Sequence, residues 1–191
     1  MSFTKFKQTY VSFLDGDEII LFTKKIQVKW EKLAIKKSKK SLYELNTTCE
    51  TPYVKLFVPE NIELTVDVRK KYVSDFYKTV LTACIEPIQR KYEKLFGLPM
   101  GDFIVTKKYS TWGTWISNLV SLRPKTSDWK ISYSLSLVLL NQKYIETVVV
   151  HELTHCFFDK HNKEFMQKTQ EVLPDFMERE FELNHICAEI N

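Results

Sequence analysis

The chain has 191 residues, of which 44% are hydrophobic, 27% charged and 14% aromatic, and its net charge is +4. This length suits one domain, with or without a small appendage, and four Gly and six Pro exclude collagen-like and Pro-rich disordered classes. No run of 18 apolar residues is present, so we expect no membrane partner. No secretory leader is recognised either, so we expect a cytoplasmic location, where the four cysteines remain free thiols.

Charge is distributed unevenly along the chain. Residues 23–40 contain eight Lys against one acid, whereas residues 171–191 contain six acids against one Arg. A lysine run is usually a solvated face, but the segment Lys24–Lys40 is also the candidate for binding nucleic acid.

The first third of the chain is predicted to be β-rich. Three apolar or alternating segments indicate strands, at residues 18–22, 26–31 and 53–58. Residues 38–51 are polar and are expected to form a connection. We expect residues 1–66 to form a small β-rich region that packs on a core of residues 67–191.

The pattern then becomes helical. Apolar residues recur at helical spacing over residues 67–96, where Gly97 is a suitable stop and Pro87 predicts a kink or a break. A strand is expected at residues 103–109. Residues 131–137 alternate apolar side chains with serine, which predicts a strand with one buried and one polar face.

Three helices are predicted near the C-terminus. Asn141 can cap a helix that begins near residue 142 and runs to about residue 158. Asn162 can cap a second helix, which must end before Pro174. An acidic amphipathic helix is expected from about Asp175.

All four histidines lie in the last 41 residues, and two of them form a known metal-binding pattern. The predicted helix at 142–158 contains His151-Glu152-Leu153-Thr154-His155. Histidines four residues apart project from one face of a helix and can bind the same zinc ion. In this motif the intervening Glu152 serves as the general base for a metal-bound water.

A tetrahedral catalytic zinc needs a third protein ligand and one open position for water. His161 follows His155 after five intervening residues and can fold back across a turn, so it is our choice. His185 is the competing histidine. Glu164 and Glu171 are the alternatives if the third ligand is a carboxylate.

These residues resemble the YgjP-like family of zinc metallopeptidases, which are neighbours of the SprT and WLM proteases. The family pattern continues here with His161-Asn162-Lys163-Glu164-Phe165 and then Leu173-Pro174-Asp175-Phe176. Upstream, Trp112-Gly113 and Ile131-Ser132 also match. The resemblance covers about residues 69–179 and is only loose over the first 65.

The resemblance implies an α+β fold with a zincin-like core, one catalytic zinc held by three histidines, and a peptide or protein substrate. The chain departs from the family near the Trp-Gly pair. Thr111 replaces an arginine, and Trp115 replaces the cysteine that follows W-G-S. Because the metal motif is intact, these departures bear on the shape of the cleft and on the choice of substrate.

In the expected mechanism, zinc lowers the pKa of its water, and Glu152 takes the proton and passes it to the leaving amine. Candidate donors that could stabilise the oxyanion are Tyr109, Tyr133 and His185, although a structural role is the more common one for each of them. Glu164 is the candidate for orienting a metal ligand. Five residues are candidates for pairing with the substrate backbone if their strand lies at a sheet edge rather than inside the sheet: Ile131, Ser132, Tyr133, Ser134 and Leu135.

Two other functions remain open from the sequence. The first is a DNA-associated protease like SprT and WLM, with Lys24–Lys40 holding the DNA. The second is a non-catalytic, zinc-stabilised interaction module, in which His185 as a fourth protein ligand would close the site to water.

Overall fold

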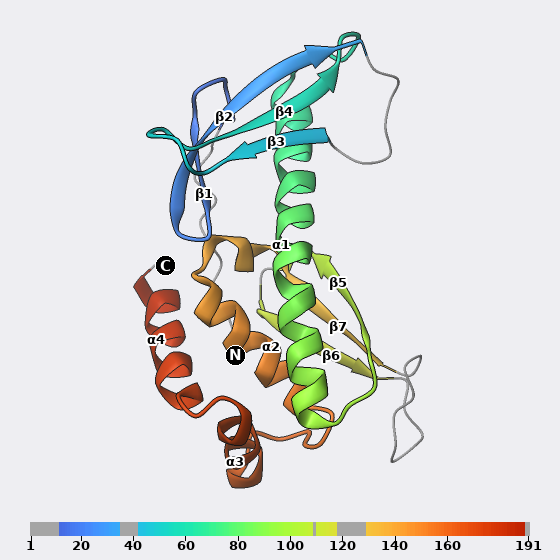
Figure 1. Cartoon of the computed structure of the whole chain (residues 1–191), viewed down its shortest axis with the longest axis vertical. Coiled ribbons are helices and arrows are strands. Elements are labelled where there is room, and N and C mark those ends of the chain that lie inside the picture. Colours follow the sequence, from blue (N-terminus) through green and yellow to red (C-terminus); the bar gives the residue numbers. More distant parts are fainter. Residues whose placement is uncertain (1–11, 35–41, 109, 118–128, 190–191) are drawn as a thin grey trace. The chain divides into compact units, whose positions relative to one another are not determined.

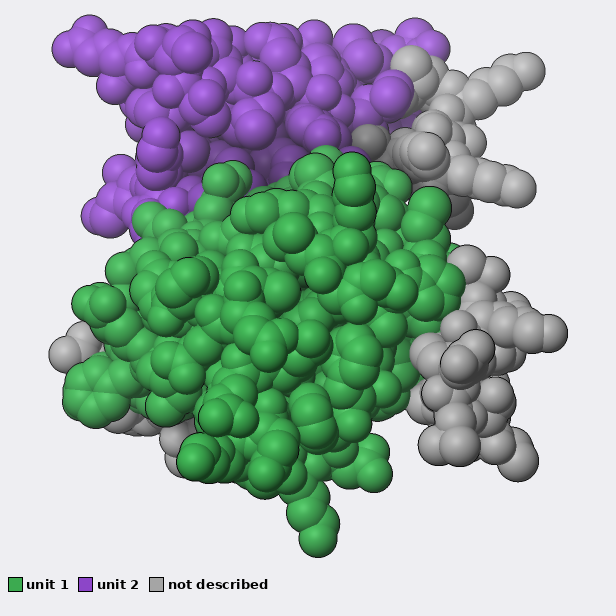
Figure 2. All heavy atoms as spheres, turned by 60° about the horizontal axis from the view of Figure 1, so that its bottom comes forward, with its two compact units in different colours: residues 1–7, 81–191 green, residues 8–80 purple. Residues whose placement is uncertain are grey.

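The computed structural model describes residues 12–34, 42–108, 110–117 and 129–189, and over these residues it has an α+β fold (Figure 1). This confirms the predicted class. The chain divides into two compact units (Figure 2). One unit contains the described residues up to Val80 and the other begins at Leu81. The helix α1 (Val66–Phe96) runs through both, and the sequence-based boundary at residues 66 and 67 coincides with its start.

The N-terminal unit contains a four-stranded sheet in the order β1-β2-β4-β3. Its strands are β1 (Glu18–Leu21), β2 (Lys24–Leu33), β3 (Leu42–Asn46) and β4 (Tyr53–Pro59). β2 and β4 are parallel, and the outer strands are antiparallel to their neighbours. Alternation buries Val54, Leu56 and Val58 of β4.

Strand β3 corrects the prediction that residues 38–51 are only a connection. The strand is short and mostly exposed, so its sequence lacks a continuous apolar signal. Tyr43 anchors it, because its ring packs edge-on against Phe76 of α1 with 5.0 Å between ring centroids.

Helix α1 is continuous, so the predicted break at Pro87 is wrong. A proline removes one main-chain hydrogen bond, and a helix of 31 residues retains the others. Gly97 ends the helix as predicted, with φ of +65° and with the amide of Leu98 donating to the carbonyl of Glu93 at 2.8 Å.

The second unit contains a three-stranded sheet in the order β5-β7-β6. Its strands are β5 (Asp102–Thr106), β6 (Gly113–Ser117) and β7 (Trp129–Ser134), with β7 parallel to β5 and antiparallel to β6. Strand β6 lies where only a Trp-rich segment was noted. Its five residues are too short for a clear alternation, although their aromatic and β-branched content favours a strand.

Strand β7 decides between the edge and the internal position left open for residues 131–135, and it corrects the predicted exposure of the serine face. The strand is internal, so Ile131, Ser132, Tyr133 and Ser134 do not form a free edge, and Leu135 already belongs to a 3-10 helix (Leu135–Leu139). The serine face is buried rather than exposed, and its hydroxyl groups bond to residues in β5 and just after it. Ser132 shares a hydrogen bond with Thr106 at 3.0 Å, and Ser134 donates to the carbonyl of Lys108 at 3.1 Å.

Three helices complete this unit: α2 (Gln142–Thr154), α3 (Lys163–Val172) and α4 (Phe176–Glu189). Both predicted caps are confirmed, because Asn141 Oδ1 accepts from the amide of Lys143 at 3.0 Å and Asn162 Oδ1 accepts from the amide of Phe165 at 2.9 Å. Helix α2 ends four residues earlier than predicted. It packs against α3, α4 and β6, and is buried from Thr147 to Thr154.

None of the helices in the described part of the chain combines the length and the apolar character needed to cross a bilayer.

Candidate metal centre and cleft

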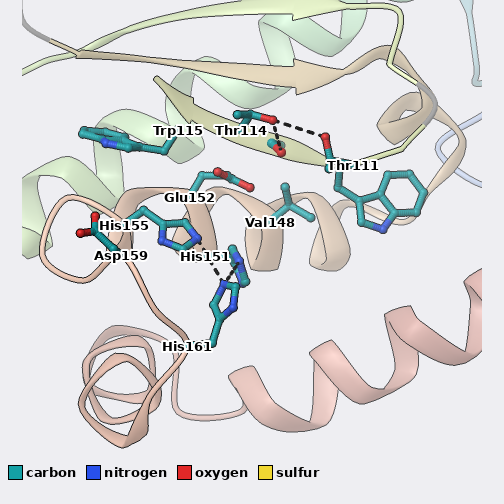
Figure 3. A pocket seen from close by; sticks show the side chains of 11 residues that line it. Thr111, Thr114, Trp115, Val148, His151, Glu152, His155, Asp159 and His161 are labelled. Atoms are coloured by element: carbon teal, nitrogen blue, oxygen red, sulfur yellow. Dashed lines mark hydrogen bonds between the residues drawn. The ribbon is translucent and has the colours of Figure 1, made fainter. Parts of the chain in front are cut away.

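Three histidines converge at the C-terminal end of α2 (Figure 3). His151 lies in the last turn of α2, His155 caps it, and His161 follows in the turn before α3. The Nε2 atom of His161 lies 2.9 Å from Nε2 of His151 and 3.3 Å from Nε2 of His155. The sequence placed these three residues on one metal ion, and the fold brings their ring nitrogens together.

The early end of α2 makes this convergence geometrically feasible. After Thr154 the chain leaves the helix, and the carbonyl of Thr154 accepts hydrogen bonds from the amides of Phe157 and Phe158. The resulting turn carries His161 back toward α2 instead of extending away along a longer helix.

The ring of His155 is held in the tautomer that a metal ligand requires. Its Nδ1 atom lies 2.9 Å from the carbonyl oxygen of Phe158. A carbonyl can only accept, so Nδ1 carries the proton and the lone pair of Nε2 faces the other two histidines.

Burial favours the neutral form of His155 and His161. Desolvation lowers the pKa of His155, and the neighbouring His151 lowers it further, although the hydrogen bond to Phe158 acts in the opposite direction. Desolvation also lowers the pKa of His161, with His151 and His155 adding to the effect. Neutral imidazole is the form that binds metals, so the cluster is preorganised for a cation.

Phe165 forms the apolar base of the cluster. The residue is fully buried in α3, and its ring centroid lies 5.1 Å from that of His151, 5.1 Å from that of His155 and 4.8 Å from that of His161. One aromatic side chain thus packs against all three imidazoles and restricts their orientations.

Glu152 lies beside the histidines and is only 7% exposed. Burial raises the pKa of its carboxyl group, while His151 and a hydrogen bond from the main chain of Trp115 act to lower this pKa. In Figure 3 the carboxylate lies between α2 and the strand that carries Thr114. Strand β6 therefore contacts the proposed general base directly.

Gly113 provides the room for this contact. A Cβ atom at position 113 would lie 2.4 Å from Oε1 of Glu152 and 2.5 Å from its Cγ atom. Real side chains do not approach so closely, so any larger residue would displace the carboxylate. The Trp-Gly pair was noted in the sequence, but its relation to Glu152 depends on the pairing of β6 with β7 and was not foreseen.

The histidines and Glu152 line one cleft of about 330 Å³. Residues 111–115 form one side of it, while α2 and the following turn, with Asp159, form the other. The ring of Trp115 lies against the buried ring of Trp129, with 4.7 Å between their centroids. Trp115, which the departures from the family pattern had linked to the shape of the cleft, lines it, and Asp159 is a lining residue that sequence reasoning did not assign.

Other residues suggested by the sequence lie elsewhere. Tyr133 is fully buried, and its hydroxyl donates to Gln89 at 3.1 Å. His185 is exposed on α4, with Nδ1 3.0 Å from the carbonyl of Phe181. Glu164 is exposed in the first turn of α3, and Glu171 pairs with Lys168.

None of these four residues lines the cleft in the described part of the chain. Tyr109 lies outside the described residues. The oxyanion donor therefore stays without an assignment.

Three of the four described lysines in the segment Lys24–Lys40 have a partner within the protein. Lys25 pairs with Glu18 at 3.2 Å, and Lys29 lies 4.1 Å from the ring centroid of Tyr53. Lys32 donates to the carbonyl of Glu60 at 3.4 Å. The four lysines at positions 36–40 lie outside the described residues, and nucleic acid binding stays a prediction.

Among the comparisons of this chain with known proteins, a match was found only to a family model. No curated protein and no solved structure matches the chain. The family model described as YgjP-like, metallopeptidase domain, matches residues 3–186, which includes the N-terminal residues that resemble the family only loosely by motif. Because this match spans nearly the whole sequence and carries the histidine cluster with it, the chain belongs to the YgjP-like metallopeptidase family.

Proposed function

We propose that the protein is a zinc-dependent peptidase with a zincin-like core, in which His151, His155 and His161 hold the metal and Glu152 is the general base. The observation that carries the proposal is the convergence of three imidazole Nε2 atoms in the same cleft as a buried carboxylate. Family membership supports a metallopeptidase of this kind.

The two separations between imidazole nitrogens agree with the distance between ligand nitrogens around one zinc ion. Two nitrogens each about 2.0–2.1 Å from a tetrahedral zinc lie about 3.3–3.4 Å apart. The separations of 2.9 Å and 3.3 Å are close to this value. Three neutral imidazoles with one open position form the donor set of a catalytic site, whereas a structural site has four protein ligands.

When bound, zinc supplies a Lewis acid that polarises the scissile carbonyl and lowers the pKa of a water molecule to near neutrality. Glu152 accepts a proton from the attacking water, whose oxygen forms a bond to the carbonyl carbon. The carbon–nitrogen bond then breaks, and Glu152 returns the proton to the leaving amine. Burial of Glu152 favours this double role because it weakens the carboxyl group as an acid.

Strand β6 is the element best placed to hold the substrate. Among the described strands it pairs only with β7, so no described strand occupies its other edge, where an extended peptide can pair. Its residues line the cleft next to Glu152. We assign to β6 the backbone-pairing role that the sequence had suggested for residues 131–135, and to Trp115 the contact with a substrate side chain.

Metal analysis combined with a proteolysis assay tests the proposal. The full chain, incubated with zinc and desalted, should retain about one zinc per molecule and degrade an unstructured protein. A chelator should abolish the degradation, and added zinc should restore it.

Two histidine variants sharpen this test. His161→Ala should lose both zinc and activity, because two imidazoles remain at the site. His185→Ala is the matched control, since this exposed histidine lies outside the cluster, and it should retain both. A wild-type protein that retains no zinc would overturn the proposal, as would full zinc content in His161→Ala.

A further inference from the structure

The ring of His151 has a buried nitrogen that needs a partner. Its Nε2 faces the cluster, so its Nδ1 points away from it. In the described part of the chain, this Nδ1 and the indole nitrogen of Trp129 are the buried side-chain nitrogens without a hydrogen bond. A buried donor without a partner destabilises the folded state, because it has lost its hydrogen bond to water.

The polar neighbour of this nitrogen is Glu180 of α4. Its Oε1 lies 3.5 Å from Nδ1 of His151, a few tenths of an ångström beyond a hydrogen bond. Both side chains are shielded from solvent, with 7% of the histidine and 15% of the glutamate exposed. The His151 ring also packs against aromatic rings, among them that of Phe176, which is nearly parallel at 24°.

Neighbouring residues of α4 fix the place of Glu180 relative to α2. Arg179 pairs with Glu146 at 2.7 Å, and Glu182 pairs with Lys143 at 2.6 Å. These two contacts flank position 180 in the sequence and both end on α2. The carboxylate of Glu180 is therefore presented to His151 by a helix that is tied to the same helix as the histidine.

We propose that Glu180 is the positioning residue of the metal centre: it accepts a hydrogen bond from Nδ1–H of His151 and so keeps the lone pair of Nε2 directed at the metal. This inference rests on the proposed function. A carboxylate behind a metal-binding histidine fixes the tautomer and the ring orientation and increases the basicity of the ligand nitrogen. The sequence had suggested Glu164 for this part, but Glu164 is exposed at the start of α3.

The test is the zinc affinity of the full chain, measured by competition with a chromogenic chelator. Glu180→Met keeps the approximate size but removes the acceptor, and it should raise the Kd for zinc by 10- to 100-fold. Glu180→Gln retains an acceptor oxygen and should lie between Glu180→Met and the wild type. Glu178→Gln is the matched control, an exposed acid on the same helix, and it should leave the Kd unchanged.

The outcomes separate this inference from the proposed function. If the wild type binds no zinc, the proposed function fails. If the wild type binds zinc and Glu180→Met binds equally well, only the role of Glu180 is overturned. An equal loss in Glu180→Met and Glu178→Gln would also overturn it, because the effect would then be one of general charge. If circular dichroism shows that Glu180→Met is unfolded, Glu180→Gln is compared with Glu178→Gln, and equal affinities overturn the inference.

Discussion

The two sheets of this protein use polar side chains in different ways. The N-terminal sheet carries exposed ion pairs such as that of Lys25 with Glu18, in which both side chains are more than half exposed. In the sheet β5-β7-β6 the polar residues Ser132 and Ser134 are buried and have specific partners. Exposed ion pairs contribute little to stability, whereas buried polar groups with fixed partners determine geometry.

This difference indicates which part of the molecule is built for chemistry. The sheet with buried polar residues places β6 against Glu152, and β6 carries a glycine where any side chain would clash. The N-terminal sheet has an ordinary alternating core of residues such as Val28 and Leu56. We therefore expect substitutions in the two sheets to separate function from stability.

The largest expected effect is that of Glu152→Gln on catalysis. Loss of a general base lowers kcat by about 10²- to 10⁴-fold. Since Glu152 is not among the proposed ligands, zinc content should remain that of the wild type. The check is a steady-state assay together with metal analysis, and a parallel loss of zinc would instead make Glu152 a ligand.

Leu56→Ala should have a large effect on stability and none on the site. Leu56 is fully buried in β4, and truncation of such a residue costs about 2–5 kcal/mol. Urea unfolding followed by circular dichroism measures the loss. The zinc Kd should not change below the unfolding transition, and a weakened zinc Kd in the folded variant would show that the two regions are coupled.

Gly113→Ala should lower kcat by about 10- to 100-fold, because the added methyl group displaces the carboxylate of Glu152. The three histidines are untouched, so zinc content should be retained. Steady-state kinetics and metal analysis on the same preparation provide the measurement. Wild-type kcat in this variant would mean that Glu152 does not act from the position described.

The smallest expected effect is that the metal-free Glu152→Gln variant is more stable than the metal-free wild type. Burial raises the pKa of Glu152, so its favourable contribution is complete below the ordinary value of 4.5 and is lost as pH rises through the raised pKa. At pH 7 the glutamine variant should be more stable by about 1 kcal/mol. This is a usual gain when a destabilising residue of a functional site is replaced.

The difference should shrink as the pH is lowered toward 4.5. Thermal unfolding in the presence of a chelator, at both pH values, provides the comparison. A glutamine variant that is less stable than the wild type at pH 7 would contradict the sign of this argument.

Several features were predictable because their interactions are local. The caps Asn141 and Asn162 bond to amides two and three residues away. The spacing of His151 and His155 follows from the period of the helix. His161 was also anticipated, since only a short turn separates it from α2.

Other features of the fold could not be predicted from local sequence patterns. Strand β3 has little apolar signal, and the alternation over residues 131–137 is the same for an edge strand and for a central strand. The serines of β7 were expected at the surface because a polar side chain usually is, and their buried partners come from β5 and the residues that follow it.

The resemblance to a known family implied the α+β class, and the sequence by itself determined the helix that carries the motif and the three histidines at its end. It did so because capping, helical periodicity and short turns depend on residues close together along the chain. Only the tertiary structure decided that β6 rather than β7 lies at the cleft, that Gly113 makes room for Glu152, and that Glu180 lies behind His151. These relations join segments far apart in sequence, and they depend on strand order and helix packing, which no local pattern encodes.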